Sequence, residues 1–192
     1  MLSEKLRAWT NPFRSALARI IGRWGISPNA VTLFGYALHL PVMWAVAVGR
    51  FTIGGILLAL AGAFDALDGS VAREMGLVTQ FGAFLDSVMD RFSEATVLLG
   101  LLLYYVQRGD RIEPILIYVA VVGSIMVSYT RARAEGLGVE CKEGLFTRFE
   151  RVILLVVGLV VGVMRPVLWV LAILTVFTAI QRIYSVWRKT LS

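Results

Sequence analysis

Six apolar segments constrain this chain more than any other feature, because each is about as long as a helix that crosses a bilayer. Such a helix takes about 20 mainly apolar residues. Hydrophobic residues make up 58% of the 192 residues, charged residues 17%, and the mean hydropathy is +0.76. A water-soluble core cannot absorb that much apolar surface. We therefore predict an all-α polytopic membrane protein with six transmembrane helices in one domain, residues 28–192. The segments lie at 28–48, 51–73, 81–105, 114–134, 146–164 and 166–187.

Local signals support these boundaries. Ser27 precedes Pro28, and this pair is typical of a helix N-cap followed by proline at the first helical position. Pro114 and Pro166 are expected to play the same part at the fourth and sixth segments. Hydropathy and helix-start signals therefore predict the same layout.

Residues 1–27 carry a different pattern, in which apolar and basic residues alternate at helical spacing. The apolar members are Leu6, Trp9, Phe13, Leu17, Ile20 and Trp24. The basic members between them are Lys5, Arg7, Arg14 and Arg23. The pattern predicts an amphipathic helix lying on the bilayer surface ahead of the first crossing. A soluble helix that packs on a partner is the alternative interpretation.

The basic residues indicate how the chain is oriented. An even number of crossings places both termini on one side, and only Arg50, Arg108, Arg111 and Arg165 of the 19 basic residues then fall on the other side. The richer side should face the cytoplasm, so both termini are expected there, in the cytoplasmic membrane. Because the charges follow this topology rather than one soluble face, we expect no nucleic-acid partner. Cys141, the single cysteine, predicts neither a disulfide nor a thiolate metal site.

The chemistry is predicted to lie in a hairpin between the second and third segments. Asp65 and Asp68 are three residues apart, and Asp86 and Asp90 are four apart, so each pair shares one helix face. The two pairs are nearly equidistant from the turn around residue 77. Folding of the hairpin is therefore expected to bring four carboxylates to a similar depth, toward the cytoplasmic side.

Four carboxylates gathered in or near a membrane require positive charge between them, since even one buried acid costs a few kcal/mol. Oxygen ligands suit Mg²⁺ or Mn²⁺, and one or two ions are compatible with four carboxylates. The alternative is that the acids form buried ion pairs with Arg73, Arg91 or other arginines. Gly69 and Gly82 leave room for a ligand near the backbone, or equally for close helix packing.

These residues resemble the CDP-alcohol phosphotransferase family. Its pattern D-x-x-D-G-x-x-A-R, eight residues, G-x-x-x-D-x-x-x-D is matched at every fixed position from Asp65 to Asp90. The resemblance implies transfer of a phosphoryl-alcohol group from a CDP-alcohol to a hydroxyl, with release of CMP. It also implies that Asp65, Asp68, Asp86 and Asp90 bind the metal, that Asp90 is the general base, and that the enzyme is a homodimer. The implied nucleotide-binding residues are Asn29, Thr32, Asp68, Gly69, Ala72, Arg73 and Gly82.

Basic residues at the ends of later segments indicate which acceptor molecule supplies the hydroxyl. The stretch Ser128-Tyr-Thr-Arg131-Ala-Arg-Ala-Glu135 and a later Glu-Arg pair are similar to those of the phosphatidylinositol-phosphate and archaetidylinositol-phosphate synthases. That similarity implies an inositol phosphate acceptor and a CDP-diacylglycerol or CDP-archaeol donor. The implied phosphate-binding residues are Ser128, Arg131, Arg151 and Arg182. The alternatives are a purely anchoring role for these arginines, glycerol 3-phosphate or an unphosphorylated acceptor, and, as a different class, a small ion transporter.

Overall fold

The computed structural model describes residues 27–74, 79–141 and 143–191, and for residues 66–74 it describes the backbone alone. Every regular element in this part of the chain is a helix, which confirms the all-α prediction there. The predicted amphipathic helix at residues 1–27 lies outside the described residues apart from Ser27. The helices are α2 (Pro28–Ala37), α3 (His39–Ala47), α4 (Phe51–Glu74), α5 (Gln80–Gln107), α6 (Ile112–Gly136), α7 (Arg148–Val161) and α8 (Met164–Thr190).

The first predicted segment is divided into α2 and α3 at Leu38. Pro41 explains the division, because its ring clashes with the carbonyl four residues earlier and it has no N–H to donate. The predicted start of this segment is confirmed: Pro28 is at the first helical position, and the Ser27 hydroxyl accepts from the backbone N–H of Ala30 at 3.2 Å. Pro114 and Pro166 instead lie two residues inside their helices, still within the first turn, where their missing N–H leaves no intrahelical bond unmade.

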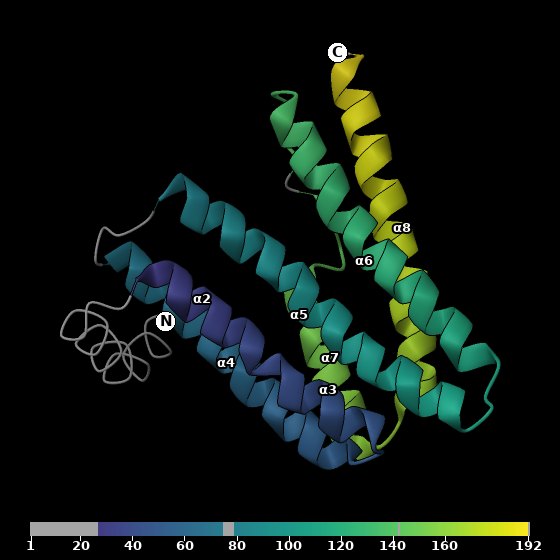
Figure 1. The fold of residues 1–192 in the computed structure, drawn as a ribbon. Coiled ribbons are helices and arrows are strands. Elements are labelled where there is room, and N and C mark those ends of the chain that lie inside the picture. The colour runs from purple at the N-terminus through teal and green to yellow at the C-terminus, as the bar shows by residue number, and fades with distance from the viewer. Residues whose placement is uncertain (1–26, 75–78, 142, 192) are drawn as a thin grey trace, which may run out of the picture.

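The long helix α5 forms the centre of the fold (Figure 1). It contacts α2 and α3 on one side and α6 on another, while α4 packs against both α3 and α7. The helices α6 and α8 run side by side over much of their length (Figure 1). The apolar core draws on nearly all of these helices and includes Val42, Val46, Leu58, Leu101, Ile117, Leu155 and Leu168.

Glycines allow the closest helix contacts. A Cβ added to Gly100 of α5 would lie 2.6 Å from the carbonyl oxygen of Met43 in α3. One added to Gly123 of α6 would lie 2.7 Å from the Cβ of Thr175 in α8. Helices in membranes commonly approach one another through such small residues.

Apolar side chains also cover much of the outer surface. Ile115, Tyr118 and Val122 form a stripe along α6 and are 63%, 69% and 41% exposed. Among the described residues, three helical segments are long and apolar enough to cross a membrane: Pro28–Ala47, Ile112–Gly136 and Met164–Thr190. The chain therefore has the character of a membrane protein. Helices occupy all six predicted segments, but the number of crossings stays a prediction.

The helix ends opposite the aspartates are joined by ion pairs. Arg165, near the start of α8, contacts Asp110 at 3.3 Å and also pairs with Glu113 of α6. Asp110 is also 3.6 Å from Arg108 at the end of α5. These contacts fasten the connection between α5 and α6 to α8.

Candidate functional site

Arg148 joins two of the predicted aspartates. Its Nη2 donates to Asp65 Oδ2 at 2.9 Å, and its Nη1 lies 2.6 Å from Asp90 Oδ1. Asp65 comes from α4, Asp90 from α5, and Arg148 is the first residue of α7. A single guanidinium therefore holds carboxylates from two helices to a third helix.

The other two predicted metal ligands lie on the same two helices. Asp86 is one turn before Asp90 on α5, is exposed, and interacts electrostatically with it, as Asp65 does. Asp68 belongs to the helical backbone of α4, but its side chain is outside the described part of the structure. Among the described side chains, no three potential metal ligands are clustered closely enough to hold an ion. Arg91 also lies 3.9 Å from Asp90, so two arginines balance the charge of these acids. Carboxylate oxygens are hard donors of the kind that Mg²⁺ or Mn²⁺ prefers.

Two of the predicted nucleotide-binding residues, Asn29 and Gly82, lie close together where α2 approaches the start of α5. A Cβ added to Gly82 would lie 3.3 Å from the Asn29 side-chain oxygen, so these two predicted residues are neighbours. Thr79 caps α5 by accepting from the backbone N–H of Gly82 at 2.9 Å. The Thr32 hydroxyl donates to the Pro28 carbonyl at 3.3 Å. Gly69, Ala72 and Arg73 lie within α4, and their side-chain positions are not among those described.

The sequence interpretation missed the roles of two residues. Arg148 was visible only as one of several basic residues near the start of the fifth segment. Gly35 was not singled out, yet a Cβ there would lie 2.8 Å from Asp65 Oδ1. The available signal was its position three residues after Thr32, which places both on one side of α2. At Gly35 the missing side chain lets α2 approach the carboxylate of Asp65 directly.

A buried ion pair lies one turn further along both α5 and α7. Arg151, whose side chain is 2% exposed, donates from Nε and Nη2 to the two carboxylate oxygens of Glu94 at 2.6 and 2.7 Å. Its Nη1 donates to the Phe146 carbonyl at 3.2 Å. Ser124 of α6 donates to Glu94 Oε1 at 2.8 Å, so the network joins three helices.

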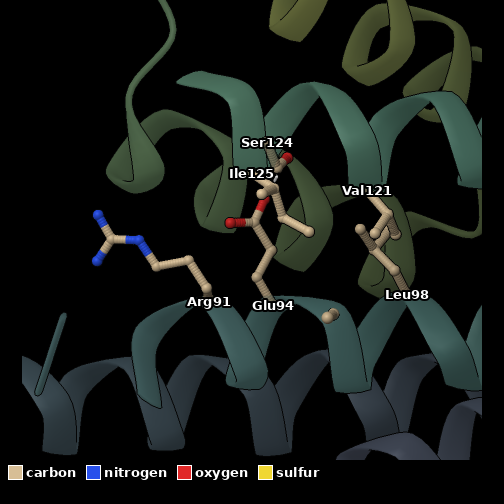
Figure 2. Close-up of a pocket in the computed structure, with 7 residues that line it drawn as sticks. Arg91, Glu94, Leu98, Val121, Ser124 and Ile125 are labelled. Atoms are coloured by element: carbon tan, nitrogen blue, oxygen red, sulfur yellow. Dashed lines mark hydrogen bonds between the residues drawn. The ribbon is translucent and has the colours of Figure 1, made fainter. Parts of the chain in front are cut away.

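Figure 2 shows Glu94 extending from α5 toward Ser124, while the Arg91 side chain points away from it. The gap beside them is lined by these residues and by Leu98, Val121 and Ile125 of α5 and α6. Its volume is about 10 Å³, which is no more than one water molecule requires. This gap is therefore a packing feature beside the ion pair and has no room for a substrate.

The other predicted acceptor residues differ in exposure. Arg131 is half exposed near the end of α6 and donates to Glu135 at 2.8 Å. Ser128, one turn earlier, is half-buried. Arg182 of α8 is buried, donates to the Glu143 carbonyl at 2.9 Å and also bonds the Val127 carbonyl. Arg182 interacts electrostatically with both Arg131 and Arg151.

Several known proteins are similar to this chain in both sequence and fold. A sequence model described as CDP-alcohol phosphatidyltransferase matches residues 25–181. An archaetidylinositol phosphate synthase of Methanothermobacter thermautotrophicus is 36% identical over 189 residues, covering 93% of this chain and 94% of the relative.

Two crystal structures of the phosphatidylinositol phosphate synthase of Mycobacterium tuberculosis resemble this fold, each with 32% identity and a TM-score of 0.84. One has CDP-DAG bound, and the match covers 91% of this chain and 93% of that one. The other is a complex with manganese and citrate, and there the match covers 91% and 88%.

The buried ion pair yields a stability prediction. Glu94→Gln removes the charge that neutralises Arg151, so we expect a loss of about 3–5 kcal/mol in the free energy of unfolding. Ser124→Ala removes one hydrogen bond and should lower it by about 1 kcal/mol. Denaturant titration of the detergent-solubilised protein measures both.

Glu135→Gln is the matched control, because it makes the same substitution in the exposed pair with Arg131. Its expected effect is below about 1 kcal/mol. Equal losses for Glu94→Gln and Glu135→Gln would contradict a special role for the buried pair.

Proposed function

The chain belongs to the CDP-alcohol phosphatidyltransferase family, and on that premise we propose that it transfers a phosphatidyl-type group from a CDP-lipid to inositol phosphate and releases CMP. The family predicted from the aspartate motif is thereby confirmed. The observation that supports the activity most directly is that Asp65 of α4 and Asp90 of α5 come together, within 2.9 Å and 2.6 Å of one guanidinium.

The proposed setting is a cytoplasmic membrane crossed six times. The predicted site residues of α2, α4, α5 and α7 lie toward one end of the fold, and Arg165 and Arg108 lie at the other. With more basic residues at the first end, we assign that end and both termini to the cytoplasm. A CDP-lipid can then enter from the bilayer while the polar acceptor arrives from the cytoplasm.

We assign metal binding to the four aspartates Asp65, Asp68, Asp86 and Asp90. Mg²⁺ or Mn²⁺, as one or two ions, would neutralise the donor's pyrophosphate and stabilise the charge that develops on it. The manganese complex of the Mycobacterium tuberculosis synthase supports a divalent ion in this family. Asn29, Thr32, Gly69, Ala72, Arg73 and Gly82 are proposed to bind the cytidine nucleotide, together with Asp68.

Asp90 is proposed as the general base. Its carboxylate takes the proton from the acceptor hydroxyl, and the oxygen attacks the phosphorus that carries the lipid. A new phosphorus–oxygen bond forms, the bond between the two phosphates breaks, and CMP leaves with its electron pair. Its contact with Arg148 keeps the Asp90 carboxylate close to Asp65.

The acceptor's phosphate is proposed to bind near Ser128, Arg131, Arg151 and Arg182. Arg131 is the exposed member, so we assign the first contact to it. Arg151 and Arg182 are buried and already donate to Glu94 and to backbone carbonyls, which positions their charges nearby. Arg182, whose contacts are to backbone carbonyls, interacts electrostatically with both Arg131 and Arg151, which favours a phosphate bound near it. We also propose, from the resemblance to the family, that the enzyme acts as a homodimer.

The acceptor is tested by measuring CMP release from CDP-diacylglycerol. Purified protein in lipid nanodiscs receives inositol phosphate, glycerol 3-phosphate, free inositol or serine, each with Mg²⁺, Mn²⁺ or a chelator. We expect inositol phosphate to give the highest kcat/KM and the chelator to abolish release. A far better reaction with glycerol 3-phosphate would reject the proposed acceptor, and full activity in chelator would reject the metal requirement.

Asp90→Asn tests the base. We expect CMP release to fall by at least about 100-fold, because proton removal contributes about 10²–10⁴-fold. CDP-diacylglycerol binding, measured by equilibrium filtration, should persist. Asp110→Asn is the control, since Asp110 is also ion-paired but lies at the opposite end. Near-normal turnover by Asp90→Asn would remove Asp90 from the reaction.

Arg131→Ala tests the acceptor site. Loss of a cation that binds the acceptor before and during the reaction raises the acceptor KM and leaves kcat largely unchanged. We expect a rise of roughly tenfold, comparable to the loss of one charge-assisted hydrogen bond. Arg133→Ala, two residues along and also exposed, is the matched variant. A larger effect at Arg133 would show that the phosphate contact is assigned to the wrong arginine.

A further inference from the structure

We propose that Arg148 is the built-in counter-cation of the aspartate site and competes with the divalent ion for Asp65 and Asp90. This inference rests on the proposed metal-dependent function. It gives Arg148 a role in metal affinity that is separate from substrate binding. The guanidinium stabilises the site between turnovers, and the metal has to displace it.

The contacts of Arg148 place it in competition with a metal ion for the same carboxylates. Arg148 places one nitrogen 2.9 Å from an oxygen of Asp65 and another 2.6 Å from an oxygen of Asp90. Mg²⁺ binds carboxylate oxygens at about 2.0–2.1 Å, so an ion held by both residues would bind the same two carboxylates that Arg148 contacts. The positive guanidinium would also be repelled by a divalent ion within a few ångströms of it.

Partial burial makes the competition significant. The side chains of Asp65, Asp90 and Arg148 are 18%, 22% and 30% exposed, so water screens their charges only in part. Arg148 Nε is buried and makes no hydrogen bond to any described residue. Among the described residues, the guanidinium is therefore held only through Nη1 and Nη2, which contact Asp90 and Asp65.

The backbone around Arg148 is fixed independently of this contact. Thr147 and Glu150 close the first turn of α7, where the Thr147 N–H donates to Glu150 Oε2 at 2.8 Å. One turn on, Arg151 is bound to Glu94. The Arg148 side chain can therefore leave the carboxylates by changing its own rotamers while α7 stays in place.

The test is Mn²⁺ binding in the absence of lipid, with free Mn²⁺ measured by electron paramagnetic resonance. Arg148→Met preserves much of the side-chain length but has no charge. We expect it to bind Mn²⁺ roughly tenfold more tightly, the effect of no longer breaking two partly exposed ion pairs. Without metal, the melting temperature of Arg148→Met should be lower than that of the wild type. Saturating Mn²⁺ should raise the melting temperature of the variant by more than it raises that of the wild type.

Arg165→Met is the matched control, because Arg165 also bridges two acidic residues, Asp110 and Glu113, but at the opposite end. It should leave the Mn²⁺ affinity unchanged. Arg148→Lys gives a second measurement should the methionine variant fail to fold. Lysine keeps the charge without the two-ended guanidinium, so its affinity should lie between those of the wild type and Arg148→Met.

The possible results separate the two proposals. Mn²⁺ affinity that is unchanged or weaker in both Arg148 variants overturns the competition, while wild-type binding leaves the metal-dependent function standing. If Arg148→Met binds Mn²⁺ and the wild type does not, Arg148 excludes the ion from the empty site, which supports the competition. If neither wild type nor any variant binds Mn²⁺, the metal site itself is overturned, and the competition with it.

Discussion

The arrangement of the site depends on the buried ion pair between Glu94 and Arg151. It joins α5 to α7 one turn away from the contacts of Arg148 with Asp65 and Asp90. A bidentate pair between two rigid helices restricts both their rotation and their sliding. A pair so deeply buried is poor evidence of high stability, but breaking it leaves an uncompensated charge. Its contribution is therefore to specify one alignment of α7 relative to the aspartates.

The features that the sequence predicted well arise from local patterns. Apolar length predicted where the helices lie, and Ser27-Pro28 predicted where the first one begins. The spacing of the four aspartates predicted that two helices would present acids together, and Asp65 and Asp90 do meet at Arg148. Asn29 was inferred only from family resemblance, yet it lies against Gly82. In each case the information is contained in a few neighbouring residues or in one motif.

The features that could not be predicted depend on contacts between distant parts of the chain. Arg151 and Glu94 are 57 residues apart, and no periodicity indicates that they pair. Arg148 and Asp65 are 83 residues apart, so choosing Arg148 among many arginines required the packing of α7 against α4. Pro41 is different, because the break it causes at Leu38 follows from local chemistry that an analysis of apolar length overlooks.

The two ends of the fold use the same chemical device in different surroundings. Arg165 is 68% exposed where it joins Asp110 and Glu113, whereas Arg148 is 30% exposed at Asp65 and Asp90. Dissolved salt screens exposed charges far more than partly buried ones. Added salt is therefore expected to weaken the contacts of Arg165 with Asp110 more than those of Arg148 with Asp90. The two clusters of charges should thus differ in how strongly the salt concentration of the surrounding solution affects them.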